Sequence, residues 1–203
     1  MRLAPATKAP VESFPVVCLG GSAGGLSAYK QILRELPADF NMAIVIVAHR
    51  ARQNAMFLVP LLAKVTTMEV VEAKEGMRLQ PNRVHVAPPQ KAITTDGMVL
   101  RLKRTKVIGW PTSIDAFLFS LAKQCASQAI AIILSGMGYD GSVALQAIKD
   151  AGGVTFAQSD ASWGSMPQSA VNTGHVDFVL TASEIGKQLA MMSEESQAAK
   201  QRS

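Results

Sequence analysis

Val-Val-Cys-Leu-Gly-Gly-Ser-Ala-Gly-Gly, residues 16–25, is the stretch that decides the fold. A short apolar run stops at a serine flanked by glycines, and residues at helical spacing follow it, which predicts a strand, a tight turn and a helix. Such a turn can cradle a phosphate on its backbone N–H groups. With serine at its tip, as in G-x-S-x-G, the turn can instead hold a nucleophile. Residues 20–24 fit the second pattern residue for residue.

Apolar runs and helical patterns alternate along most of the chain. Residues 42–48 form a continuous aliphatic run, which is typical of a strand buried on both faces. The alternation predicts a doubly wound α/β fold, with a mostly parallel sheet and helices on both faces. We expect strands at 14–19, 42–48, 129–134, 154–158 and 176–180, and helices at 25–36, 54–64, 113–126, 141–151, 168–173 and 183–192, the last capped by Ser183.

The middle of the chain has a different pattern. Short strand-like segments with proline and glycine between them occur at 70–72, 83–87, 92–95 and 99–103. Asp96-Gly97 separates the last two, which is a strong signal for a hairpin. We therefore expect a small antiparallel hairpin insertion near residues 83–103, at an edge of the sheet.

Length and composition predict one domain. The 203 residues suffice for one sizeable core, and the chain has no internal repeat or linker. We expect a disordered lead-in at 1–13, a single α/β domain at 14–192 and a polar tail at 193–203. No apolar stretch reaches the ~18–20 residues that span a bilayer, and residues 1–14 lack a signal-peptide core. The two cysteines resemble small buried hydrophobes, so we expect a cytoplasmic protein without membrane insertion.

The charge pattern argues against nucleic-acid binding. The net charge is +5, but aromatic residues make up only 5% and the Lys and Arg residues are scattered. Nucleic-acid binders concentrate such charge and interleave aromatic residues with it. We therefore expect no nucleic-acid partner, and an anionic protein surface could use the same charge. The three histidines lack the spacing of a zinc site.

Three of the expected strands end in the residue types that a serine hydrolase needs. Ser22 follows the first strand, His49 the second, and Asp140 the strand at 129–134. In doubly wound sheets, ligands bind beyond the carboxyl ends of the strands. A serine nucleophile, a histidine base and an orienting carboxylate can therefore meet there. The chain order Ser, His, Asp differs from that of the α/β-hydrolases and argues against that family, not against the chemistry.

The residues by themselves leave other interpretations open. Ser22 could serve as a helix cap or phosphate contact, His49 as a polar strand end, and Asp140 as the N-cap of a helix that begins at Gly141. Dinucleotide binding is disfavoured because the glycines do not match G-x-G-x-x-G. His49-Arg50 also stands where that motif needs an acidic residue. No G-x-x-x-x-G-K-[ST] sequence occurs, which excludes a P-loop.

Several separated motifs point to one family. They are Gly-Gly-Ser-Ala-Gly-Gly at 20–25, Val-Ala-His at 47–49, Glu-Gly-Met at 75–77, Val-Ala-Pro at 86–88, Ser-Ile-Asp at 113–115, Leu-Ser-Gly-Met-Gly-Tyr-Asp-Gly at 134–141, and Met166-Pro167 with Ala170. Together they resemble the catalytic domain of CheB-type protein-glutamate methylesterases, the chemotaxis family, over about residues 14–189. The motif at 134–141 is the most specific, whereas Gly21 and Ala48 replace the family's alanine and glutamine.

The resemblance implies an enzyme and assigns roles to its residues. Ser22 would be the nucleophile, His49 the base and Asp140 the third member of the triad. The implied reaction removes the γ-methyl ester from methylated glutamates of chemoreceptor-type proteins and, as in many members, deamidates glutamines, without metal or cofactor. Alternatives are a catalytically silent scaffold of the same fold or a nucleotide-binding oxidoreductase. The expected oxyanion and substrate vicinity comprises Ala23, Gly24, Met137, Gly138 and Met166.

The beginning of the chain bears on its regulation. Members of the family usually start with a phosphorylatable receiver domain, and only about 14 residues precede the first expected strand here. We therefore expect a methylesterase domain without a receiver domain, either as a stand-alone enzyme or with a regulatory partner in place of the receiver domain.

Overall fold

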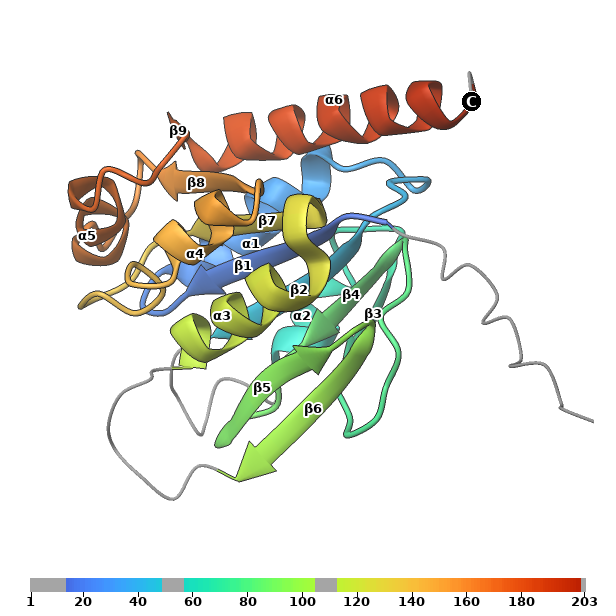
Figure 1. Cartoon of the computed structure of the whole chain (residues 1–203), viewed down its shortest axis with the longest axis horizontal. Helices are drawn as coiled ribbons and strands as arrows, with labels where there is room; N and C mark the ends of the chain where they lie inside the picture. Colours follow the sequence, from blue (N-terminus) through green and yellow to red (C-terminus); the bar gives the residue numbers. More distant parts are fainter. Residues whose placement is uncertain (1–13, 49–56, 105–112, 202–203) are drawn as a thin grey trace, which may run out of the picture.

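A seven-stranded parallel sheet forms the centre of the computed structural model, which describes residues 14–48, 57–104 and 113–201 (Figure 1). Every pairing described within this sheet is parallel, in the order β3-β4-β2-β1-β7-β8-β9. This confirms the expected α/β fold. The strands are β1 (Val16–Gly21), β2 (Ala43–Ala48), β3 (Glu69–Glu72), β4 (Arg83–Val86), β7 (Ala129–Ile133), β8 (Val154–Gln158) and β9 (Phe178–Leu180).

Helices cover both faces of the sheet, each over its own hydrophobic core. Side chains of β1 alternate between the two cores, because successive residues of a strand point to opposite faces: Val16 and Cys18 enter one core, and Val17 and Leu19 the other. The first core lies under α3 (Ser113–Cys125), α4 (Leu145–Asp150) and α5 (Ser165–Asn172). The second lies under α1 (Gly25–Glu35), α2 (Leu58–Leu62) and α6 (Ala182–Gln201), and a short 3-10 helix, η2 (Ala126–Gln128), precedes β7.

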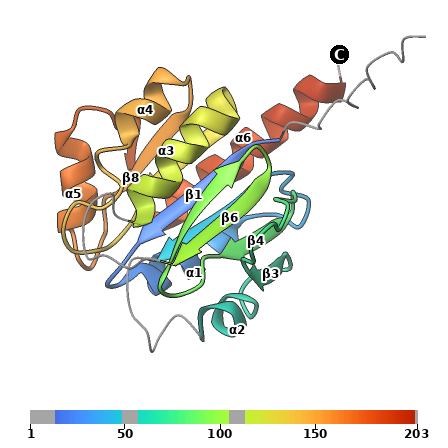
Figure 2. The same ribbon diagram turned by 60° about the horizontal axis from the view of Figure 1, so that its bottom comes forward.

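The hairpin is smaller than the sequence suggested. It consists of β5 (Lys91–Asp96) and β6 (Val99–Arg104), which form a separate antiparallel sheet beside α3 (Figure 2). The expectation that it starts near residue 83 is wrong, because β4 pairs in parallel with β2 and β3 in the main sheet. Val84 and Val86 of β4 are buried in the core shared with α1 and α2. A short strand of this kind resembles a hairpin strand in sequence.

The last helix starts earlier and runs further than expected. Ser183 is not its N-cap: its hydroxyl donates to Glu35 Oε1 of α1 at 2.7 Å. Thr181 caps the helix instead, since its Oγ1 accepts the Glu184 N–H at 3.3 Å and Glu184 Oε2 accepts the Thr181 N–H at 2.8 Å. This reciprocal pair is a capping box. The helix continues past residue 192, where buried Ser193 donates its hydroxyl to the carbonyl of Phe40.

Other helix boundaries differ by a few residues. α4 begins at Leu145 rather than at residue 141, because a series of turns follows Asp140. α5 begins at Ser165, three residues earlier than expected. α2 covers Leu58–Leu62, whereas residues 54–56 of the expected helix lie outside the described residues. No helix in the described ranges is long and apolar enough to cross a membrane.

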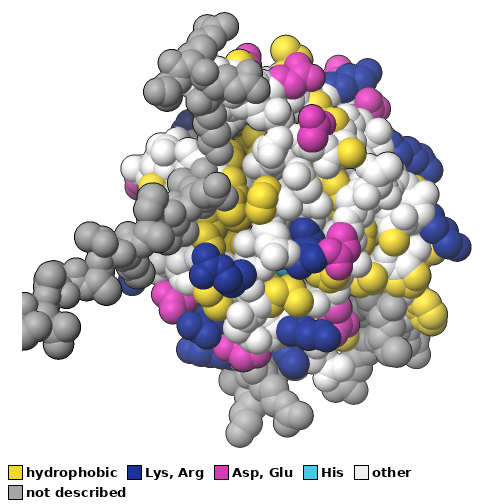
Figure 3. Space-filling view, turned by 90° about the vertical axis from the view of Figure 1, so that its right-hand side faces the viewer, with side chains coloured by type: hydrophobic (Ala, Val, Ile, Leu, Met, Phe, Trp, Pro, Cys, Tyr) yellow, Lys and Arg dark blue, Asp and Glu magenta, His cyan; other side chains and the backbone are white. Residues whose placement is uncertain are grey.

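The surface charge is mixed on the face shown in Figure 3. Lys and Arg side chains lie among Asp and Glu side chains there rather than in a single basic patch (Figure 3). Two exposed ion pairs show the same mixing. Arg83 contacts Glu69 across β4 and β3, and Arg101 of the hairpin lies 3.5 Å from Glu75.

Candidate active site

The turn after β1 and the loop after β7 meet at the carboxyl end of the sheet. β1 lies between β2 and β7, so the chain leaves it toward one side of the sheet and later returns on the other. This is the topological switch point, where doubly wound folds bind ligands. The Ser22 N–H donates to the Ser135 carbonyl at 2.9 Å, which joins the two segments directly. Two of the three expected strand ends are therefore adjacent.

Glycines allow this close approach at two positions. Gly24 has φ +78°, in the left-handed region that favours glycine. At Gly136, an added Cβ would overlap Met166 Sδ and lie 3.0 Å from Ser22 Cβ. Gly136 therefore packs directly against the serine, and Met166, which is fully buried, lies beneath it. The sequence predicted Met166 in the vicinity of the site, and the structure shows it buried against Gly136 rather than exposed at the surface.

Asp140 is held at the start of α3. Its side chain is buried, with 4% exposure, and Oδ1 accepts the N–H groups of Ile114 and Asp115, both at 3.1 Å. Backbone N–H groups at a helix N-terminus stabilise a carboxylate. The interpretation of Asp140 as the cap of a helix starting at Gly141 is thus wrong, because it caps the first turn of α3. Asp115 makes the converse contact, accepting the Ala144 N–H at 3.1 Å.

Cys18 is a fully buried thiol on β1. Burial raises the pKa of the Cys18 thiol, and the nearby Asp140 carboxylate raises it further. The same shift keeps the thiol protonated, so Cys18 does not act as a nucleophile.

His49 lies outside the described residues. The described part of β2 ends at Ala48, whose register partner on β1 is Gly21, the residue before Ser22. The triad of Ser22, His49 and Asp140 therefore remains a prediction.

Some backbone N–H groups around Ser22 already donate a hydrogen bond within the protein, and others are available to donate to a substrate. Those of Gly25 and Gly136 donate to the carbonyls of Ser22 and Trp163 at 3.1 and 2.9 Å. The Gly138 N–H donates to Ser165 Oγ at 3.0 Å, which argues against the role near the oxyanion that we expected for Gly138. Within the described ranges, three N–H groups of this region have no hydrogen-bond acceptor: those of Ala23, Gly24 and Met137.

Two segments that contact the turn carry exposed apolar side chains. Met137 is 60% exposed and Trp163 50% exposed, and Trp163 Cδ1 would lie 3.2 Å from a Cβ at Gly24. Trp163 and Ser135 were not predicted as site residues. Ser135 lies within the motif at 134–141, but no local pattern gives Ser135 or Trp163 a role, because their contacts come from segments far apart in the chain.

Together these observations define a doubly wound α/β domain with a candidate serine-hydrolase site at its switch point. A family model described as CheB methylesterase matches residues 17–189. The chain therefore belongs to the CheB methylesterase family, which confirms the resemblance seen in the motifs.

Relatives and a solved structure agree with this assignment. A protein-glutamate methylesterase/protein-glutamine glutaminase of Anaeromyxobacter dehalogenans is 37% identical over 189 residues, 92% of this chain and 54% of the relative. One from Carboxydothermus hydrogenoformans is 35% identical over 185 residues, 86% of this chain and 54% of the relative. The chain thus spans about half the length of these curated relatives. The crystal structure of the Thermotoga maritima CheB methylesterase catalytic domain aligns with a TM-score of 0.81 and 29% identity, covering 89% of this chain and 99% of that one.

Proposed function

We propose that this chain hydrolyses the γ-methyl esters of methylated glutamates in chemoreceptor-type signalling proteins, with Ser22 as the nucleophile. The observation that carries the proposal is the position of Ser22, at the switch point and hydrogen-bonded to the loop that leads to Asp140. The names of the relatives support the reaction class, because they are protein-glutamate methylesterases.

The mechanism proceeds through an acyl-enzyme. Ser22 Oγ attacks the ester carbonyl while His49 accepts its proton, and His49 then passes the proton to the departing methanol. Water, deprotonated by His49, attacks the acyl-enzyme, releases the glutamate and restores the serine hydroxyl. Asp140 orients His49 and stabilises its cation.

The free N–H groups supply the electrostatic part of the reaction. In serine hydrolases with a nucleophile at a sharp turn, the residue after the serine donates its N–H to the oxyanion. Ala23 holds that position, and Met137 offers a second free N–H from the loop after β7. Two such donors stabilise the negative charge of the tetrahedral intermediate, and each is worth roughly 10²–10³ in rate.

Glutamine deamidation is a second reaction of the same site. The relatives' names include protein-glutamine glutaminase. Attack on a carboxamide gives the same acyl-enzyme and releases ammonia in place of methanol. We place both reactions in the cytoplasm, in keeping with the two free, buried cysteines of the chain. Control by a separate regulatory partner belongs to the same proposal.

The test compares wild type with Ser22→Ala. We expect wild type to release methanol from a methylated receptor and to react with a fluorophosphonate probe, and Ser22→Ala to do neither. Ser27→Ala is the matched control, since this serine lies five residues further on, exposed on α1. Equal methanol release by wild type and Ser22→Ala would overturn the assignment. No release by wild type would favour a silent scaffold.

A further inference from the structure

Ser135 lies buried beside the serine turn, and all of its polar groups are engaged. Its hydroxyl donates to the Ala23 carbonyl at 2.8 Å and accepts the Trp163 N–H at 3.0 Å. Its carbonyl accepts the Ser22 N–H at 2.9 Å, and its N–H donates to Gln158 Oε1 at 2.9 Å. With 1% exposure, Ser135 makes these contacts away from solvent. One residue thus joins the serine turn to the segments around 158 and 163.

The hydroxyl determines the orientation of a peptide group next to the nucleophile. In a trans peptide the C=O and the following N–H point in opposite directions. Because Ser135 Oγ holds the Ala23 carbonyl, it also fixes the direction of the Gly24 N–H, which is one of the free donors. The Ser135 carbonyl holds the Ser22 N–H on the other side of the same turn. The turn is therefore fixed both before and after Ser22 Oγ.

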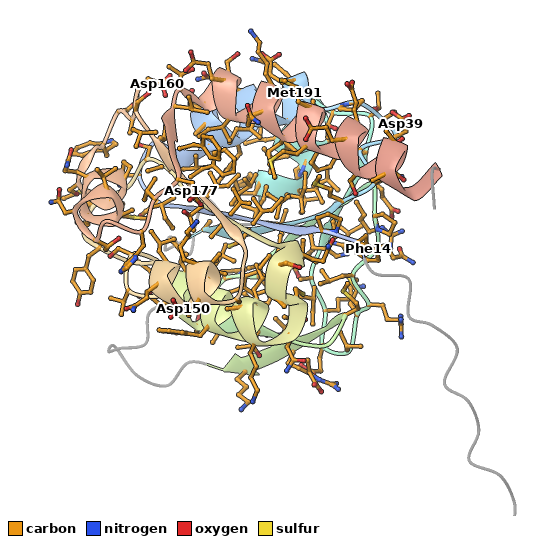
Figure 4. The ribbon with its side chains drawn as sticks, turned by 45° about the horizontal axis from the view of Figure 1, so that its top comes forward. Phe14, Asp39, Asp150, Asp160, Asp177 and Met191 are labelled. Carbon is orange, nitrogen blue, oxygen red and sulfur yellow. The ribbon has the colours of Figure 1, made fainter. Side chains whose placement is uncertain are left out.

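Ser135 itself is supported from behind. Gln158, at the end of β8, donates from Nε2 to Asp160 Oδ1 at 2.9 Å. The same oxygen accepts the Ala182 N–H at 3.1 Å, at the first residue of α6 (Figure 4). This chain of contacts connects the loop after β7 to the start of a long, packed helix. Rigid support of this kind is what a site needs to hold its geometry to within about 0.5 Å.

We propose that Ser135 is a positioning residue, which holds the Ser22 turn and the Gly24 N–H in the arrangement required for attack. The inference rests on the proposed esterase function. Removing the hydroxyl would free the Ala23 carbonyl to rotate and leave the Trp163 N–H without an acceptor. Misplacement by about 1 Å can cost ~10²-fold in rate. We expect Ser135→Ala to lower kcat by ~10- to 100-fold, with KM for the methylated receptor within about two-fold of wild type.

Ser193→Ala in the same full chain is the matched control. Ser193 is also 1% exposed and donates its hydroxyl to a backbone carbonyl, but it lies on α6 outside the site. Each variant loses two hydrogen bonds of a buried hydroxyl, one donated to a backbone carbonyl and one accepted, so we expect similar falls in Tm. Only Ser135→Ala should lose kcat and react more slowly with the fluorophosphonate probe. If the two variants keep the same kcat at the same Tm, the positioning role is refuted.

Amide hydrogen exchange separates this inference from the proposed function. We expect the amides of Trp163, Ser22 and Gly25 to exchange faster in Ser135→Ala than in Ser193→Ala, whether or not the wild type releases methanol. If the wild type is inactive, the esterase proposal fails, and faster exchange still supports the hold on the turn. Unchanged exchange at all three amides would overturn the hold in either case.

Discussion

Replacing Asp140 by asparagine separates the structural from the catalytic role of this side chain. The carboxylate accepts two backbone N–H groups at the start of α3. Asparagine keeps an oxygen for these donors but loses the charge. A hydrogen bond to a charged group contributes ~1.5–3 kcal/mol and a neutral one ~0.5–1.5 kcal/mol, so two bonds lose about 2 kcal/mol of unfolding free energy together. The fold should survive this loss.

The effect of the same change on catalysis should be much larger. Without the negative charge, nothing stabilises the histidine cation or selects its tautomer, and kcat is expected to fall by ~10⁴-fold. Methanol release gives kcat, and urea unfolding gives the free energy. Asp177→Asn is the control, since its carboxylate accepts the Thr155 N–H at 2.9 Å outside the site. Asp177→Asn should lower stability and leave kcat intact. The reasoning is refuted if Asp140→Asn retains kcat within ~10-fold of wild type, or if both variants lose kcat equally.

Two further predictions concern stability. Met166→Ala should lower the free energy of unfolding by ~2–5 kcal/mol because Met166 is fully buried. Met137→Ala, at a 60% exposed position, should change this free energy by less than ~0.5 kcal/mol. Equal effects of the two variants in urea unfolding would contradict the buried position of Met166 or the exposed position of Met137. Partial burial alone would raise the pKa of Asp177, but hydrogen bonds from Lys149 and Thr155 outweigh it and hold the pKa below the usual 3.8. The ionised carboxylate therefore stabilises the fold above pH 3.8, and this contribution is lost as the pH falls through the lower folded-state pKa. Asp177→Asn should make the free energy of unfolding depend less on pH in the acid range. An unchanged pH dependence would argue against this role of Asp177.

The sequence predicted the parallel sheet well because its central strands carry an unambiguous signal. Residues 42–48 are aliphatic throughout, as a strand buried on both faces requires. The hairpin boundaries were less predictable, since β4 is short and its place in the main sheet depends on pairing with residues of β2 that lie 40 positions earlier. The cap of α6 was misassigned for a local reason. Ser183 was the predicted cap, whereas Thr181 and Glu184 form a capping box two residues before it and one residue after it.

The site was predictable only as far as its strand ends. The rule that parallel strands end at one edge brought together the turn at Ser22 and the loop leading to Asp140. The same rule places Ser135 directly after the expected strand at 129–134, but it does not give the role of Ser135, because the partners Ala23, Gln158 and Trp163 are set by tertiary contacts. Sequence reasoning also could not show which N–H groups lack an acceptor. The Gly138 N–H, for example, donates to Ser165 Oγ, which belongs to another segment of the chain.

The contact between Asp140 and the first turn of α3 affects how active members of this family can be told from inactive ones. The fold uses this carboxylate to begin a helix, independently of any reaction. A related chain that has lost turnover would still be destabilised by replacing it, so an aspartate here can outlast the activity. Inspection of this one position therefore does not distinguish an esterase from a scaffold. In the proposed mechanism the Ser22 side chain is the nucleophile itself, which makes it the more informative residue to compare.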